Sequence, residues 1–287
     1  MAIPAMDVYA MSSALWEAAK AGNTAKASRL IDAGAPVNWK NFAEDGSTAL
    51  SVAALNGHRD TVELLLDRGA DLEAKVEFIG ATALMKAAGA GRRNMVELLL
   101  DRGADLEAKT EFNGATALTM AAGAGRRNVV ELLLNRGANL EAKVDFNGAT
   151  ALTMAAGAGR RNVVELLLDR GANLEAKVDG GATALVRAAL NGHRDTVGLL
   201  LDRGADLEAK TFGGLTALMR AAKGGHRDTV ELLVACGANV EAQCSAGKVA
   251  LDFCAANACA SVLQGAERIQ RWYRRRILAM WADTFVM

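Results

Sequence analysis

Three histidines are the first residues to consider for chemistry, because the ordinary pKa of histidine lies close to neutral pH and suits it to acid–base catalysis. His58, His193 and His226 each follow the glycine of the same hexapeptide, Gly-His-Arg-Asp-Thr-Val. Since they belong to different repeats of the chain, the three rings are not expected to converge on one substrate. No serine, cysteine or aspartate has a base and an orienting partner nearby in the repeat. The sequence therefore predicts a protein that is not an enzyme and uses no cofactor.

The four cysteines are the next candidates, because clustered cysteines often bind zinc. They lie close together near the C-terminal end, but no two form a Cys-x-x-Cys pair and no histidine lies among them. We therefore expect no metal site, and buried free thiols in a reducing compartment instead. The cysteines are Cys236, Cys244, Cys254 and Cys259.

A glycine turn before two arginines could bind phosphate, because a helix N-terminus attracts anions. The pentapeptide Gly-Ala-Gly-Arg-Arg begins at Gly89, Gly123 and Gly157. Three copies at regular spacing suit a polyanion or a lipid headgroup, which we keep as the alternative function. The interpretation we prefer is a turn between helices with solvated arginines, because the charge of the chain does not favour polyanions.

The charge is unevenly distributed along the chain. The formal net charge is zero, with 33 basic and 33 acidic residues. Residues 265–287 carry five arginines against Glu267 and Asp283, which leaves a net charge of −3 on the residues before them. Because these residues offer no excess positive field, nucleic acid is not expected as a partner.

The elements that position these residues follow from an internal repeat. The tripeptide Thr-Ala-Leu recurs at intervals of 34, 34, 34, 33 and 33 residues. Its threonine can cap a helix, and the alanines after it favour one. A glycine then ends this helix, and a second helix follows with apolar residues at i, i+3 and i+4. The threonines are Thr48, Thr82, Thr116, Thr150, Thr183 and Thr216.

The predicted fold is all-α, a solenoid of stacked helix pairs joined by hairpin-like fingers. A helix pair this short cannot bury its apolar face alone, so neighbouring pairs must stack into one continuous core. The spacing predicts about seven or eight repeats including the caps, plus a C-terminal helix.

The segment from Gly57 to Lys75, Gly-His-Arg-Asp-Thr-Val-Glu-Leu-Leu-Leu-Asp-Arg-Gly-Ala-Asp-Leu-Glu-Ala-Lys, closely resembles the second helix and finger of the ankyrin family. The resemblance covers roughly residues 13–264. It implies an ankyrin-repeat solenoid that binds proteins as a scaffold or adaptor. The family's Thr-Pro-Leu-His is Thr-Ala-Leu here, followed by a residue other than histidine, so we expect the hydrogen bonds of that histidine to be missing. The residues in its place are Ser51, Met85, Thr119, Thr153, Val186 and Met219.

The resemblance also implies a binding surface on the finger tips and on the inner face of the first helix of each pair. Phenylalanines recur at the tips, where they would form an exposed apolar strip or fold back over the neighbouring finger. The finger-tip candidates are Phe78, Ile79, Phe112, Asn113, Phe146, Asn147 and Phe212, and the inner-helix candidates are Arg187, Asn191, Arg220 and Lys223.

The segment from Ala266 to Trp281 resembles an IQ motif, the helical segment that calmodulin and related EF-hand proteins bind. The first half of the motif is present, whereas the second half departs from it. In a helix, its apolar side chains would lie on one side and arginines would cover much of the rest, which suits an EF-hand partner or an anionic membrane surface. The alternative is a helix that closes the end of the solenoid. The predicted contact residues are Ile269, Gln270, Trp272, Tyr273, Arg274, Ile277 and Trp281.

The chain is thus expected to contain three segments. Residues 1–12 form an N-terminal extension, residues 13–264 the repeat domain, and residues 265–287 a basic amphipathic helix. We expect no transmembrane segment, because no run of about 20 uncharged apolar residues exists, and no secretory signal, because no basic region precedes an apolar one. These features favour a cytoplasmic protein, with cytoskeletal association left open.

Overall fold

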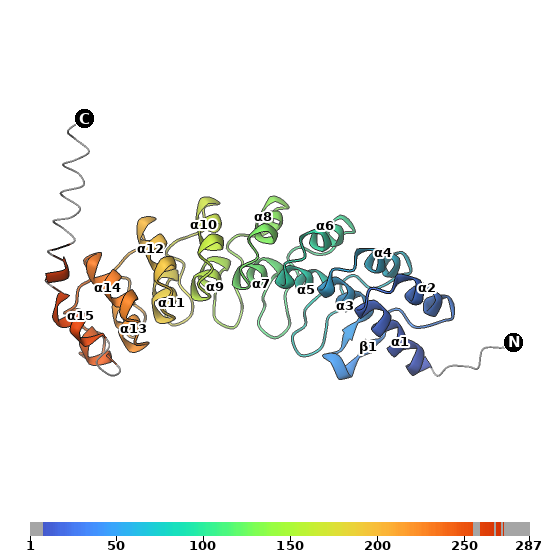
Figure 1. The fold of residues 1–287 in the computed structure, drawn as a ribbon, viewed down its shortest axis with the longest axis horizontal. Helices are drawn as coiled ribbons and strands as arrows, with labels where there is room; N and C mark the ends of the chain where they lie inside the picture. Colours follow the sequence, from blue (N-terminus) through green and yellow to red (C-terminus); the bar gives the residue numbers. More distant parts are fainter. Residues whose placement is uncertain (1–7, 255–258, 267, 271, 273–287) are drawn as a thin grey trace, which may run out of the picture. The chain divides into compact units, whose positions relative to one another are not determined.

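The computed structural model describes residues 8–254, 259–266, 268–270 and 272 of the 287-residue chain. The chain divides after Phe146 into two compact units, which are described separately. Both consist of stacked helix pairs, each with an inner helix and an outer helix that follows it (Figure 1). From α3 to α13, each inner helix begins directly after the recurring threonine. This arrangement confirms the predicted all-helical solenoid.

In the first unit, four helix pairs stack on one another. The inner helices α1, α3, α5 and α7 lie side by side, and the outer helices pack on the same core, α2 against α4 and α6 against α8. The helices are α1 (Val8–Lys20), α2 (Thr24–Asp32), α3 (Ala49–Asn56), α4 (Arg59–Asp67), α5 (Ala83–Ala90), α6 (Arg93–Asp101), α7 (Ala117–Gly123) and α8 (Arg127–Asn135).

The second unit continues the same pattern and ends in a shortened repeat. Helices α9, α11 and α13 stack as the inner layer, and the short 3₁₀ helix η2 packs against α13 in the place of a further inner helix. The elements are α9 (Ala151–Gly157), α10 (Arg161–Asp169), α11 (Ala184–Leu190), α12 (Arg194–Asp202), α13 (Ala217–Lys223), α14 (Arg227–Ala235), η2 (Ala250–Phe253) and α15 (Ala260–Gln264).

The first finger of the first unit differs from the others. Its two strands, β1 (Lys40–Asn41) and β2 (Ser47–Thr48), pair antiparallel and enclose a 3₁₀ turn, η1 (Phe42–Glu44). Helix α1 begins at Val8, within the segment expected to be an extension. Trp16 of α1 is only 1% exposed, and its indole N–H donates to Ser47 Oγ at 3.1 Å, which anchors the first helix to this finger.

The core is formed by small and branched side chains from both helices of each pair. The leucine of every Thr-Ala-Leu is at most 2% exposed, so each repeat contributes the same buried contact to its neighbours. Burying one such side chain stabilises the fold by about 1.5–3 kcal/mol before the entropy of ordering it is subtracted. These leucines are Leu50, Leu84, Leu118, Leu152, Leu185 and Leu218.

The recurring threonine caps the inner helices α3, α5, α7, α9, α11 and α13, as predicted. In the fourth helix pair of the first unit, the Thr116 hydroxyl accepts from the Thr119 backbone N–H at 3.3 Å. The Thr119 hydroxyl in turn accepts from Thr116 N at 2.9 Å and donates to Thr116 O at 3.0 Å. Ser51 and Thr153 close the same reciprocal capping box in their own repeats.

These capping boxes correct one expectation. We expected the hydrogen bonds of the family's histidine to be missing from every repeat, but a hydroxyl at Ser51, Thr119 and Thr153 supplies hydrogen bonds at that position. The physical reason is geometric: a serine or threonine three residues after the capping threonine lies close enough for its hydroxyl to bond to the backbone N–H and C=O of that threonine. Met85 and Val186 carry no hydroxyl at the equivalent position.

Candidate binding surface

The finger-tip phenylalanines point into solvent. In the first unit, Phe78 is 80% exposed, Phe112 72% and Phe146 75%, and Ile79 beside Phe78 is 44% exposed. In the second unit, Phe212 is 80% exposed. None of these rings is buried by its neighbour. The ring of Phe212 does lie against the preceding finger, where a Cβ added at Gly181 would come within 2.8 Å of its Cδ1. Apolar rings exposed to this degree at successive tips need an explanation other than core packing.

The fingers that carry these rings are tied to one another by backbone hydrogen bonds. In the first unit, Phe112 N donates to Ile79 O at 3.4 Å, and Asp145 N donates to Asn113 O at 2.8 Å. In the second unit, Phe212 N donates to Gly180 O at 2.9 Å. Because each finger is joined to the next, the tips form a preformed surface that loses little conformational freedom on binding.

The two finger-tip asparagines have a structural role. Asn113 Oδ1 accepts from the Thr110 hydroxyl at 2.6 Å and from Ala115 N at 3.2 Å, and Asn147 Oδ1 accepts from Ala149 N at 3.0 Å. Both side chains therefore hold the turn of their own finger. Whether they also contact a partner stays a prediction.

Four predicted residues lie on the inner helices of the second unit. Arg187 on α11 and Arg220 on α13 are half-buried, whereas Lys223 and Asn191 are exposed. Asn191 Nδ2 donates to Gly157 O at 2.7 Å, across to the neighbouring inner helix. Burial lowers the pKa of the Arg187 guanidinium from its ordinary value, but arginine remains charged at neutral pH.

The histidines support the framework instead of forming a catalytic site. Nε2 of His58 lies 3.0 Å from Lys20 O, that of His193 3.0 Å from Gly157 O, and that of His226 2.9 Å from Leu190 O. A carbonyl oxygen can only accept, so each Nε2 carries the proton and donates to the preceding inner helix. Every ring therefore joins its repeat to the one before, and none faces another histidine.

The first arginine of the Gly-Ala-Gly-Arg-Arg turns takes the place of this histidine in other repeats. Arg92 Nε donates to Leu55 O at 3.1 Å, and Arg126 Nε donates to Gly89 O at 3.0 Å. Arg93 also donates from Nη1 to Asn128 O at 2.9 Å. Because these guanidinium groups already bind backbone carbonyls, the turns offer less to a phosphate than their sequence indicates.

The cysteines correct a second expectation. All four thiols are free, but only Cys244 and Cys259 are buried, while Cys254 is half-buried and Cys236 is exposed. Cys236 directly follows the last residue of α14, where the chain leaves the packed face of the helix. Within the described residues, no three histidine, cysteine, aspartate or glutamate side chains are placed to hold a metal ion.

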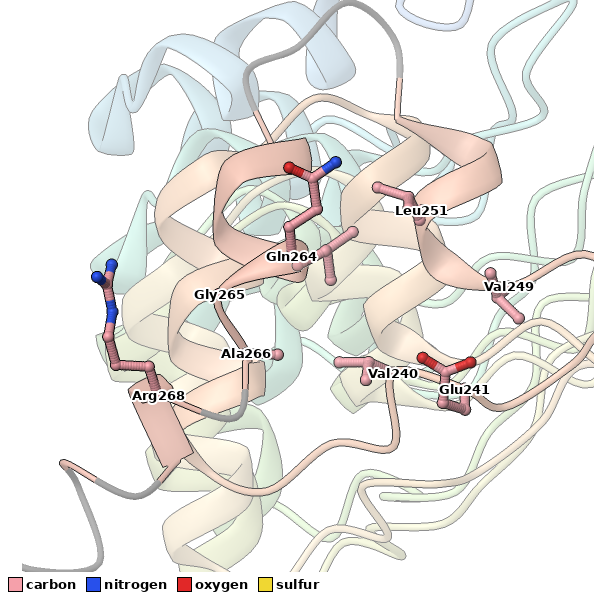
Figure 2. Close-up of a pocket in the computed structure, with 9 residues that line it drawn as sticks. Val240, Glu241, Val249, Leu251, Gln264, Gly265, Ala266 and Arg268 are labelled. Atoms are coloured by element: carbon pink, nitrogen blue, oxygen red, sulfur yellow. The ribbon is translucent and has the colours of Figure 1, made fainter.

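A pocket of about 490 Å³ opens at the C-terminal end of the second unit (Figure 2). Its walls combine apolar and polar groups, from Val240 and Glu241 of the last finger, Val249 and Leu251 of the closing repeat, and the end of α15 with the segment after it. Glu241 and Arg268 lie at opposite sides of it. Since the pocket brings no acid and base together, it provides no catalytic pair.

The described part of the tail contacts the solenoid. Ile269 and Gln270 are half-buried, and Gln270 Nε2 donates to Ala238 O at 3.2 Å. Trp272 is 52% exposed. The contact of Gln270 favours the end-closing alternative for this turn. The other predicted contact residues lie outside the described residues; they are Tyr273, Arg274, Ile277 and Trp281.

The exposed ring of Phe42 was not among the residues predicted from the sequence. Phe42 is 66% exposed in the first finger, in the 3₁₀ turn η1. It lies four residues before the finger glycine Gly46, whereas Phe78 lies two residues before Gly80. Counting from the glycines therefore does not align Phe42 with the other rings.

Among the described helices, none is long and apolar enough to cross a membrane.

Comparison with known proteins supports this architecture. A family model described as ankyrin repeats (3 copies) matches residues 6–76, 75–144 and 139–211, and a single ankyrin repeat matches residues 213–245. The structure resembles that of the human ASB11 ankyrin repeat domain with a TM-score of 0.70 and 27% identity, covering 77% of this chain and 98% of that chain.

A curated relative matches over a shorter stretch. Human mitochondrial disaggregase is 49% identical over 59 residues, which is 21% of this chain and only 8% of that protein. The similarity thus concerns a small part of the relative and says nothing of its other segments. Because family models match almost all of residues 6–245, and because the helix pairs, fingers and neighbouring structure agree with them, the chain belongs to the ankyrin repeat family.

Proposed function

We propose that this protein is a scaffold or adaptor that binds a protein partner through its finger tips and the inner face of its helix pairs. Ankyrin repeats are generally protein–protein interaction modules and non-enzymatic scaffolds. The observation that carries the proposal is the row of exposed finger-tip rings, which includes Phe78, Phe112 and Phe146 in the first unit. Aromatic rings are enriched where protein interfaces concentrate their binding energy.

The alternative function, polyanion or lipid-headgroup binding, has less support. It relied on the paired arginines of the Gly-Ala-Gly-Arg-Arg turns. Arg92 and Arg126 donate to backbone carbonyls of the preceding repeat, which leaves fewer of their donors for phosphate. Binding to a polyanion would weaken steeply as salt rises, whereas the proposed apolar contacts would not.

Regulation by an EF-hand protein at the tail is a finer prediction. The exposed ring of Trp272 is compatible with it, whereas the hydrogen bond of Gln270 to Ala238 O occupies one side chain that such a partner would bind. Capture by calmodulin of the full chain, but not of a chain ending at Gly265, would support it.

The test of the main proposal removes rings without disturbing the fold. The variant Phe112→Ala/Phe146→Ala deletes two exposed rings, and Val8→Ala trims a 56% exposed side chain on α1 as a control. Partners captured from native cell extract by the wild-type chain are identified, and the same partners are then measured with each variant. We expect the double variant to lose a partner that Val8→Ala retains, with an unchanged melting temperature.

Two outcomes would contradict the proposal. If the double variant melts at a lower temperature, the two rings stabilise the fold, and their exposure is no evidence of a binding surface. If both variants capture the same proteins in the same amounts, the finger tips are not the binding surface.

A further inference from the structure

The inner face of the second unit carries positive charge without negative charge. Helices α9, α11 and α13 contain two arginines and one lysine, but no acidic residue. Arg187 and Arg220 occupy equivalent positions, each four residues after the capping threonine, and Lys223 lies one turn beyond Arg220. Because stacked helices lie about 10 Å apart, the two guanidinium groups follow one another at the spacing of the repeat.

These three cations have no counter-ion within the part of the chain that the structure describes. The outer helices differ, since Arg203, directly after α12, pairs with Asp169 at 2.8 Å and with Glu165 at 3.7 Å. The Nε groups of Arg187 and Arg220 are moreover buried without a hydrogen-bond acceptor. A buried donor without an acceptor is rare in folded proteins.

The surroundings of Arg187 explain why its donor has no acceptor. The side chain lies over Gly157 of the preceding inner helix, where an added Cβ would come within 3.0 Å of Nε. The nearby carbonyl, Gly157 O, already accepts from Asn191 Nδ2 at 2.7 Å and from His193 Nε2 at 3.0 Å. Both lone pairs of that oxygen are thus used, and the guanidinium is held against the helix without a bond of its own.

We propose that this inner face, which we call the α11–α13 face, binds a protein segment that carries carboxylates, with Arg187 and Arg220 each taking one. A carboxylate that draws a guanidinium away from the helix accepts from Nε–H and Nη–H together, the side-on geometry that the two groups share. Lys223 adds a third positive charge at the end of the row. The inference rests on the proposed function and specifies the chemistry of the partner.

The apolar residues beside the cations favour a protein segment over a phosphate polymer. Leu190 is 37% exposed one turn after Arg187 on α11, and Met154 is half-buried on α9. A peptide can place apolar side chains against these residues and acidic ones against the arginines, whereas a phosphate backbone offers only charge.

The test is a selection from a random peptide library displayed against the full chain. We expect the wild-type chain to enrich peptides in which acidic residues alternate with apolar ones. The variant Arg187→Gln/Arg220→Gln should abolish the enrichment in acidic residues. It should also lower the affinity for the selected peptides about tenfold for each arginine removed. Arg194→Gln removes an exposed arginine from α12 and should change neither.

The contradicting results are distinct from one another. The inference is overturned if acidic residues are not enriched, or if the double variant gives the same enrichment. If Arg194→Gln weakens peptide binding as much as the double variant does, the attraction is long-range and does not arise at the α11–α13 face, which also overturns it. Tighter binding of inorganic polyphosphate than of the selected peptides assigns the face to phosphate instead. A lowered denaturation midpoint of the double variant makes the arginines packing residues.

The failure of this inference can be told apart from failure of the proposed function. If the double arginine variant still captures the partner that Phe112→Ala/Phe146→Ala loses, the finger tips bind a protein and the α11–α13 face does not contribute.

Discussion

Replacing Thr119 by valine removes one buried hydroxyl and keeps the shape of the side chain. The hydroxyl accepts from Thr116 N at 2.9 Å and donates to Thr116 O at 3.0 Å, and Thr119 is 1% exposed, so water cannot replace either bond. Each intramolecular hydrogen bond contributes about 0.5–1.5 kcal/mol net, and a buried donor left unpaired costs about 1–3 kcal/mol. We therefore expect Thr119→Val to lower the free energy of unfolding by about 2 kcal/mol.

The reciprocal substitution provides a matched comparison. Val186 occupies the equivalent position in a repeat of the second unit, is also 1% exposed, and follows a threonine with nearly the same backbone conformation as Thr116. Val186→Thr introduces the hydroxyl that Thr119→Val removes. We expect it to close a capping box and to stabilise the protein by up to about 1 kcal/mol.

The assay is urea denaturation followed by circular dichroism, with the midpoint and slope of each variant compared with those of the wild-type chain. If the chain unfolds cooperatively, a loss of about 2 kcal/mol corresponds to a melting temperature lower by about 3 °C for 287 residues. Shifts of the same sign for the two substitutions would refute the reasoning, since the exchanged groups are the same.

Two further predictions concern backbone geometry and thiol chemistry. Gly159→Ala should destabilise the protein more than Gly171→Ala in the same denaturation assay: both glycines have positive φ, but an added Cβ at Gly159 meets His193 at 2.6 Å, whereas nothing lies within 4 Å at Gly171. Equal losses in the free energy of unfolding would contradict this, because they would mean that the strain of positive φ alone sets the cost and the contact with His193 adds nothing. Although Cys236 is exposed as a whole residue, partial burial of its thiol and, second, the charge of Asp202 raise the pKa of that thiol. A raised pKa lowers the thiolate fraction at a given pH, so alkylation of Cys236 should be slower near pH 8 than in an unfolded peptide, and its rate should still rise above the ordinary pKa of about 8.5. A rate that levels off at or below that pH would contradict this.

The repeat made most of the fold predictable from the sequence. Local conformational preferences explain the roles of the recurring threonine, of the alanines after it and of the glycine between the helices. Because the same pattern recurs several times in one chain, it can be recognised without other sequences. Leu118 and its counterparts are buried as the periodicity indicates. The framework role of His193 likewise followed from its constant place in the repeat, although its acceptor, Gly157 O, became visible only in the structure.

What the sequence could not predict is which side chains bond to which backbone groups, and where a finger departs from the common turn. Nothing in the pattern shows that Thr119 bonds back to its own cap, or that Arg92 takes the place of a histidine on the preceding carbonyl. The buried Nε of Arg187 depends equally on a neighbouring carbonyl that is already occupied. Phe42 was missed because its finger contains a 3₁₀ turn, which changes the count to the finger glycine.

Site-specific photo-crosslinking is the sharpest test of protein binding at the finger tips and inner helices, because it locates a partner on the surface of the intact chain. A photo-crosslinking amino acid is placed at Phe112 on a finger tip, at Asn191 on the inner face of the second unit, or at Asp195 on the outer helix α12, where the side chain is 80% exposed. Each chain is irradiated in native cell extract, and the products are identified by mass spectrometry. We expect a protein partner to be crosslinked from Phe112 and from Asn191 but not from Asp195. Crosslinking from Asp195 alone would place the binding surface on the outer helices and overturn the proposed function.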